Sequence, residues 1–242
     1  LLNSLFMFFA SKIFGYSELA LRLPNIFSGV LFAISIFLIA QNTSKPLLAL
    51  LLFLLLLFNP FLTDFFALAR GYGIGTAFFT LGMFFSIALF KKENWIYHSY
   101  LASGSFILAV LSNYSFLIGY AGVFLSVVAY LASEGKFKNP GKSNYLVKFI
   151  PLVVINIVFL LFVIKILWGF KEHNLLYDGG KNGFFQDTFF SLVSCFFYNK
   201  LTDAVNNVVL FCLTAWLLFC FYLSFIKRIV SLESKLLSLA IF

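Results

Sequence analysis

The sequence predicts an all-α protein, a polytopic bundle of transmembrane helices with about seven spans in 242 residues. The chain is 62% hydrophobic and only 11% charged, with a mean hydropathy of +1.00. A soluble domain is about a quarter charged and about half apolar, so polar residues are too few here to cover a soluble globule. An ordinary soluble enzyme, a disordered protein and a disulfide scaffold are therefore excluded. Lipid offers backbone groups no partners and the segments lack the alternation of barrel strands, so every span must be helical.

Apolar segments long enough to cross a bilayer follow one another along the chain, and they are uncharged except for Lys165 in the sixth. A spanning helix needs about 20 mostly apolar residues, because the hydrocarbon layer is about 30 Å thick and a helix rises about 1.5 Å per residue. The predicted spans are 23–44, 46–63, 71–90, 95–112, 116–133, 149–168 and 204–226. The opening segment 1–11 is too short to span and is predicted as a buried or interfacial helix, or the end of a preceding one. Both ends lie inside apolar stretches, so we treat residues 1–242 as a single, partial transmembrane domain.

Most boundaries between spans have a local cause. Pro60 breaks the second span and leaves a short helix over 61–69 at the outer interface. The uncharged stretch 99–133 is too long for one helix, and Asn113-Tyr114-Ser115 is the predicted turn within it. Lys165 lies near one end of the sixth span, where its aliphatic stem lets the ammonium group reach the interface.

Loop charge predicts the orientation of the spans. Seven spans place the loops 41–46, 91–98, 133–148 and 226–235 on one side, with ten lysines and arginines against three acidic residues. The opposite side holds seven basic and six acidic residues. Because cytoplasmic loops carry the excess of positive charge, the first side is predicted to be cytoplasmic. Most of the net charge of +8 is thus a topology signal, and no nucleic-acid partner is needed to explain it.

The outer junction between the second and third spans is the first candidate site. Asp64 precedes Arg70 by six residues, so the two do not share a helix face as an i,i+4 pair does. Arg70 enters the third span directly, where its charge needs an anion, a carboxylate or water, and arginine suits bidentate binding of phosphate or carboxylate. Gly71, Gly73 and Gly75 allow close helix packing. In the alternative reading, Arg70 reaches lipid headgroups and Asp64 is a solvated loop acid.

The long outer loop at 169–203 is the second candidate site, since a loop of this length is expected to carry function or its own structure. His173, Asp178 and Asp187 are candidates to bind a divalent cation or a sugar. Their spacing matches no metal motif, so turn and N-cap roles are favoured for them. The loop is predicted to be a partly ordered periplasmic segment with an amphipathic helix at 189–198.

Two stretches of the sequence together resemble a known family. They are GYSELALRLP at 15–24, which contains Glu18 and Arg22, and ARGYG at 69–73, which contains Arg70 and Tyr72. With the spans between them they resemble the GT-C membrane glycosyltransferases, in the branch with protein O-mannosyltransferases and aminoarabinose transferases (glycosyltransferase family 39-like). The outer-loop sequence YDGG at 177–180 is similar to bacterial members of that group.

This resemblance implies a GT-C-like helix bundle in the cell inner (plasma) membrane, acting in the cell envelope. Such enzymes move a sugar from a polyprenyl-phosphate carrier to an acceptor at the extracytoplasmic membrane face. Here Arg70, together with Arg22, would face the donor phosphate. Tyr72, Asp64 and Glu18 would complete the substrate-binding set, and the loop at 169–203 would cover it.

The resemblance assigns no catalytic residue within this sequence. The catalytic acid of such enzymes lies in the first outer loop, which here would precede Leu1, so the fragment alone is not expected to be active. The donor sugar and the acceptor are not specified. A divalent cation is an open alternative as cofactor.

Two other functions stay open. A transporter or lipid flippase would carry polar residues in mid-span and internal repeats with broken helices, whereas only Asn156 lies deep in a predicted span. A non-catalytic membrane assembly subunit would lack an acid in the first outer loop of the complete protein. The resemblance favours glycosyl transfer over both.

Overall fold

A computed structural model of the chain describes residues 1–42, 46–91, 95–133, 144–173, 207–212 and 214–215. In this part of the chain the secondary structure is helical with no strand, which confirms the all-α prediction there. The chain divides into two compact units, one built on Leu1–Asn156 and the other on Ile157–Lys235, and each is described by itself.

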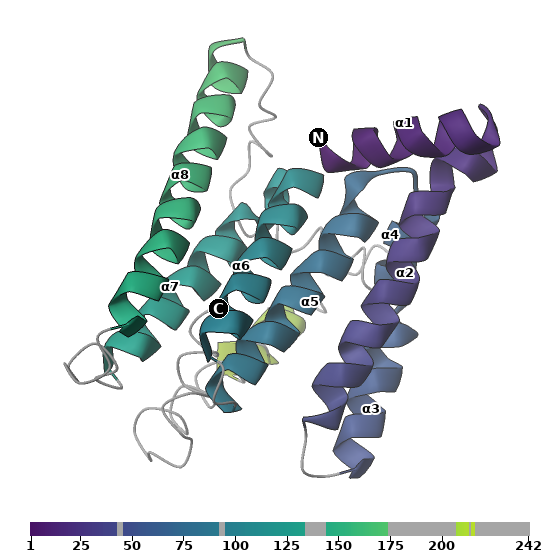
Figure 1. The fold of residues 1–242 in the computed structure, drawn as a ribbon. Helices are drawn as coiled ribbons and strands as arrows, with labels where there is room; N and C mark the ends of the chain where they lie inside the picture. The colour runs from purple at the N-terminus through teal and green to yellow at the C-terminus, as the bar shows by residue number, and fades with distance from the viewer. Residues whose placement is uncertain (43–45, 92–94, 134–143, 174–206, 213, 216–242) are drawn as a thin grey trace. The chain divides into compact units, whose positions relative to one another are not determined.

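The helices follow one another with short connections (Figure 1). They are α1 (Leu2–Phe14), α2 (Glu18–Gln41), α3 (Pro46–Leu57), α4 (Pro60–Ala67), α5 (Gly71–Lys91), α6 (Trp95–Ser112), the 3₁₀ helix η1 (Tyr114–Phe116), α7 (Leu117–Ser133) and α8 (Asn144–Glu172). Among the described residues, three helical stretches are each long and apolar enough to cross a membrane, namely α2, Gly71–Leu89 of α5 and Ile150–Glu172 of α8. The chain therefore has the character of a membrane protein.

The second predicted span, 46–63, is not one helix. It is divided into α3 and α4, with Pro60 as the first residue of α4. Proline is tolerated there because the first helical N–H has no intrahelical partner. The short helix predicted at 61–69 is confirmed as α4.

The fourth to seventh predicted spans agree with the observed helices to different degrees. The sixth extends beyond 168 to Glu172, where the Trp168 indole donates to the Glu172 carboxylate (Nε1–Oε1 2.7 Å), so the start of the predicted loop at 169–203 is helical. The fourth and fifth coincide closely with α6 and α7. Most of the seventh, 204–226, lies outside the described residues.

The turn predicted at Asn113-Tyr114-Ser115 is confirmed. Asn113 ends α6 in an extended conformation and caps η1. Its side-chain oxygen accepts from the Ser115 backbone N–H at 2.9 Å and from the Ser115 hydroxyl at 2.8 Å. The first of these bonds satisfies one of the N–H groups that a new helix leaves without partners, so the chain can reverse direction between α6 and α7.

Helix α2 begins at Glu18, earlier than the predicted span at 23. Ser17 is its N-cap, and the Ser17 hydroxyl oxygen accepts from the Ala20 N–H at 3.1 Å. Glu18 lies in the first turn, where a negative charge is favourable at the positive end of the helix dipole. Glu18 and Arg22 therefore lie on a helix and not in a loop.

Ser17→Ala is expected to lower the stability of the protein by about 1 kcal/mol, because the mutation removes the N-cap of α2. The measurement is thermal unfolding in detergent. Ser4→Ala is the matched control, since Ser4 is exposed inside α1 and caps no helix. Equal melting temperatures for the two variants would contradict the capping role.

The first unit is organised around α5, which packs against both α2 and α6. Phe32 and Ile36 of α2 meet Ala77 of α5 in a buried cluster. Phe66 of α4 packs on this cluster with its ring 5.1 Å from that of Phe32, and Phe53 of α3 also packs there. The apolar contacts thus fix α4, and with it the junction to α5, against α2.

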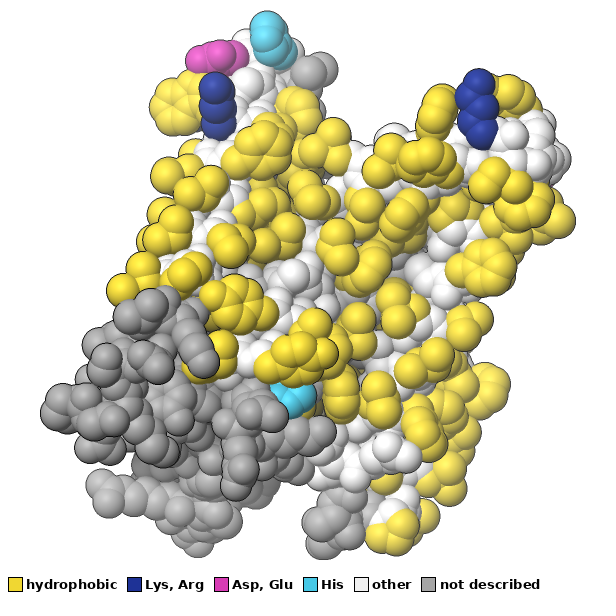
Figure 2. All heavy atoms as spheres, in the orientation of Figure 1, with side chains coloured by type: hydrophobic (Ala, Val, Ile, Leu, Met, Phe, Trp, Pro, Cys, Tyr) yellow, Lys and Arg dark blue, Asp and Glu magenta, His cyan; other side chains and the backbone are white. Residues whose placement is uncertain are grey.

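The outward faces of the helices remain apolar. None of the residues of α3 is buried, and Leu47 and Leu55 are about 70% exposed. Figure 2 shows apolar side chains over much of the described surface on one face, with few charged ones. Such a surface suits contact with lipid and not with water.

Helix α1 exposes one apolar side and buries the other. Phe8 and Phe9 are about half exposed, whereas Ala10 and Ser11 are buried. Figure 1 shows α1 lying across the end of α2. These features agree with the short buried or interfacial helix expected at 1–11.

Candidate functional site

Arg70 lies in the bend between α4 and α5, directly before the first residue of α5. Its side chain is exposed, and within the described part of the chain the structure gives it no hydrogen bond or ion pair. An arginine presents five N–H donors in a planar fork that matches phosphate or carboxylate. Arg70 is therefore an available anion-binding group at this end of α5.

Two glycines after Arg70 hold the junction tightly against its neighbours. A Cβ on Gly71 would overlap the backbone carbonyl oxygen of Ser112 at the end of α6. A Cβ on Gly73 would lie 2.6 Å from the carbonyl oxygen of Phe65 in α4. The sequence predicted close packing at these glycines, and the structure confirms it. The backbone that carries Arg70 is thus fixed on two sides.

A third neighbour of this junction is Asn25 of α2, which sequence reasoning did not single out. Asn25 is fully buried, and its Nδ2 donates to the Oδ1 of Asn3 in α1 at 3.3 Å. Its Oδ1 would lie 2.9 Å from a Cβ on Gly73, so the Asn25 amide packs directly on the α5 backbone. The sequence did carry a signal for this residue, because Asn25 is a polar side chain directly after Pro24 inside an apolar span.

Tyr72 and Asp64 belong to the same junction. The Tyr72 ring stacks on Phe65 of α4 with centroids 5.2 Å apart and planes at 21°, and it stays 36% exposed. Asp64 precedes Phe65 in α4 and is exposed. The structure therefore brings Arg70, Tyr72 and Asp64 to one connection between helices.

Arg22 and Glu18 form a separate pair on α2. The Arg22 guanidinium donates to the Glu18 carboxylate four residues earlier, on a largely exposed part of the helix. No hydrogen bond or ion pair between described residues joins this pair to Arg70. Arg22 and Arg70 lie at the same end of the unit. Arg22 lies in α2 three residues before Asn25, and Arg70 lies just before α5, three residues before Gly73, which Asn25 contacts. Helices α2 and α5 run in the same direction. Since exposed i,i+4 pairs are worth only about 0.3–0.5 kcal/mol, an anion can compete for Arg22.

Of the three candidate residues predicted in the outer loop, the structure describes His173. His173 is exposed just after the end of α8, in the second unit. Asp178 and Asp187 lie outside the described residues. Within the residues that are described, no three His, Cys, Asp or Glu side chains come together as metal ligands.

Comparison with known proteins gives no relative. No family model, curated protein or solved structure matches this chain. The chemistry of the site therefore has to be argued from its own residues.

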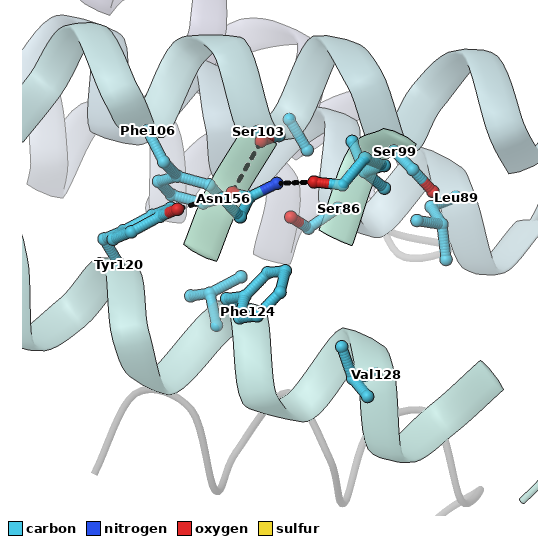
Figure 3. A pocket seen from close by; sticks show the side chains of 12 residues that line it. Ser86, Leu89, Ser99, Ser103, Phe106, Tyr120, Phe124, Val128 and Asn156 are labelled. Atoms are coloured by element: carbon cyan, nitrogen blue, oxygen red, sulfur yellow. Dashed lines mark hydrogen bonds between the residues drawn. The ribbon is translucent and has the colours of Figure 1, made fainter. Parts of the chain in front are cut away.

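A second polar site lies inside the first unit. Asn156 of α8 is fully buried, and it accepts hydrogen bonds from Ser103 of α6 and Tyr120 of α7 (Figure 3). The sequence identified Asn156 alone. Its partners were not found, because serines and tyrosines in apolar helices are common and only the packing of helices brings these two to Asn156.

Proposed function

We propose that this chain is part of a GT-C-type glycosyltransferase, which moves a sugar from a polyprenyl-phosphate carrier to an acceptor. The observation that carries this proposal is Arg70, an exposed guanidinium with no described partner on a backbone fixed by neighbouring helices. Arg70 lies in the second of the two stretches that resemble that family. A cation held in this way suits a phosphate group at the end of an apolar chain.

The chemistry gives each residue of the junction a role. The bond between the sugar anomeric carbon and the phosphate oxygen breaks, and the acceptor oxygen forms the new bond. Negative charge builds on the departing phosphate, where Arg70 stabilises it, with Arg22 as a second cation once Glu18 is displaced. Tyr72 offers an exposed ring and hydroxyl to the sugar, and Asp64 offers a carboxylate to its hydroxyls. The acceptor proton passes to a carboxylate base, which in enzymes of the resembled family lies in the first outer loop.

An assay of the full-length protein tests this function. Purified protein in proteoliposomes is given a panel of polyprenyl-phosphate sugars with the cell envelope fraction as acceptor. Transfer of labelled sugar and matching release of polyprenyl phosphate are expected, with and without a chelator to read the metal dependence. Absence of both products with every donor, from a folded protein, would contradict the proposal and favour the assembly-subunit alternative.

We also propose that the protein is a multi-pass protein of the inner (plasma) membrane, with the Arg70 end of α2 and α5 on the extracytoplasmic side. Single cysteines at Ser115 and Gln41, in a cysteine-free background, test this orientation. Both positions are exposed, and they lie at opposite ends of predicted spans. In intact cells, Ser115→Cys is expected to react with an impermeant maleimide and Gln41→Cys only after lysis. The reverse pattern would place the site in the cytoplasm.

A transporter or lipid flippase is the second candidate, and the buried Asn156 site favours it, because polar groups deep in a helix bundle mark solute paths. The cavity beside Asn156 limits this reading. It offers about 30 Å³ to the centres of water molecules, which is room for about two waters and not for a sugar or a lipid headgroup. Glycosyl transfer therefore remains the preferred function.

A further inference from the structure

Asn25 of α2 is a buried polar side chain with an unsatisfied oxygen. The residue is fully buried, and its Nδ2 donates to the Oδ1 of Asn3 in α1 at 3.3 Å. Its own Oδ1 is shielded from solvent and has no hydrogen-bond partner in the described part of the chain. A buried acceptor without a partner destabilises a fold, so native proteins rarely retain one without a reason. That reason lies in what the oxygen contacts.

The Asn25 oxygen lies against the first turn of α5. Gly73 is the third residue of this helix, and a Cβ placed on it would lie 2.9 Å from the Asn25 Oδ1. The amide can come this close because glycine has no side chain. The first N–H groups of a helix have no intrahelical acceptors and form the positive end of its dipole. An amide oxygen is therefore favourable beside this turn, and it draws α5 toward α2.

The turn that Asn25 contacts follows directly on Arg70. Arg70 precedes Gly73 by three residues, which is less than one helical turn, so a displacement of this turn carries the Arg70 backbone with it. Asn3, the hydrogen-bond partner of Asn25, also packs here, with its Cβ 3.5 Å from the position of a Cβ on Gly71. Helices α1 and α2 and the start of α5 thus meet at the Asn25 amide.

We infer that Asn25 is a positioning residue for Arg70. Because Asn25 is fully buried, it does not touch a substrate, and it acts through the first turn of α5. This inference rests on the proposed function, in which the Arg70 guanidinium binds the donor phosphate. A binding group that is held in place loses less freedom when its ligand arrives, so the affinity is higher. Asn25 thus raises the affinity of the junction for phosphate by fixing the backbone that carries Arg70.

A double-mutant cycle on ligand binding tests this inference. The full-length protein in nanodiscs is titrated with polyprenyl phosphate, and the dissociation constant is measured for the wild type, Asn25→Leu, Arg70→Ala and the double variant. Leucine has a similar size to asparagine but no polar side-chain atom. We expect Asn25→Leu to weaken binding about fivefold when Arg70 is present and less than about twofold in Arg70→Ala, because a residue that acts through another loses its effect when the other is absent.

The matched control is Asn156→Leu. Asn156 is also a fully buried asparagine, but its hydrogen-bond partners Ser103 and Tyr120 lie in α6 and α7. Its effect on binding is expected to be the same with and without Arg70. Thermal unfolding shows which variants are folded. If Asn25→Leu does not fold, Asn3→Ala takes its place with the same expectation, since it removes the hydrogen-bond partner of Asn25 from a half-buried position.

Three outcomes would overturn the inference, and they treat the proposed function differently. If Asn25→Leu weakens binding by the same factor with and without Arg70, or does not weaken it, Asn25 does not position Arg70, and the phosphate role of Arg70 stands. If Asn156→Leu is coupled to Arg70 as strongly as Asn25→Leu is, the effect is general and again leaves the proposed function intact. If Arg70→Ala binds polyprenyl phosphate as tightly as the wild type does, the role of Arg70 in the proposed function fails together with the inference.

Discussion

Arg70→Ala in the full-length protein is expected to lower sugar transfer by about 10²–10³-fold, the usual effect of removing one donor that stabilises developing negative charge. The side chain is exposed and the backbone beneath it is fixed by Gly71 and Gly73, so the truncation removes charge without opening the core. The measurement is the release of polyprenyl phosphate under saturating donor. Thermal unfolding of the same sample shows whether the protein is still folded.

Three further variants separate the role of Arg70 from a general effect of positive charge. Arg70→Lys keeps the charge but loses the planar fork, so it is expected to recover only part of the activity. Arg22→Ala is expected to lower sugar transfer less than Arg70→Ala does, because the Arg22 guanidinium is already paired with the Glu18 carboxylate. Lys12→Ala is the control, since Lys12 lies over the Phe8 ring at the far end of α1. Full activity of Arg70→Ala would refute the assignment of Arg70 to the donor phosphate.

Gly71→Ala and Gly73→Ala are each expected to destabilise the folded protein by about 1–3 kcal/mol, as overpacking of a close contact does. At both positions the new Cβ would meet a backbone carbonyl oxygen, Ser112 in one case and Phe65 in the other. Backbone cannot rotate away as a long side chain can, so the helices must separate.

The matched control for these variants is Gly104→Ala. Gly104 also lies inside a helix, α6, but nothing lies within 4 Å of a Cβ placed there. Alanine has a better helix propensity than glycine, so this variant is expected to be neutral or more stable by up to about 1 kcal/mol. The melting temperature in detergent measures the stability of each of the three variants. If Gly104→Ala were as destabilising as the other two variants, the close contacts at the α5 junction would not explain the loss of stability in Gly71→Ala and Gly73→Ala.

The apolar pattern was sufficient to predict most of the helices in the described part of the chain. Composition predicted the all-α class, and the turn at Asn113 and the break at Pro60 were predicted because both depend on local chemistry: an amide that caps a turn and a ring that removes an N–H. The start of α2 was missed. A span was sought in apolar residues alone, whereas the Ser17 cap allows Glu18 and Arg22 to be helical before the apolar stretch begins.

The candidate site was predictable only in part. Arg70 and Tyr72 stood out because a charge and an aromatic hydroxyl are unusual at the start of an apolar span. Asn3 and Asn25 did not, because their pairing joins residues 22 positions apart and depends on how α1 crosses α2. The pairing of Asn156 with Ser103 and Tyr120 also depends on how helices pack against one another. Contacts between distant residues arise from helix packing, and a single sequence carries no local signal for them.

The division of the second predicted span has a consequence for the lipid around the protein. Helix α3 has 12 residues, so it is about 18 Å long, well short of a hydrocarbon layer of about 30 Å. A helix shorter than the bilayer is accommodated by local thinning of the membrane. With α3 embedded as proposed, we expect lipid headgroups beside it to be drawn inward near the start of α5. A lipid phosphate would then meet Arg70 at a depth that the undisturbed bilayer surface does not reach.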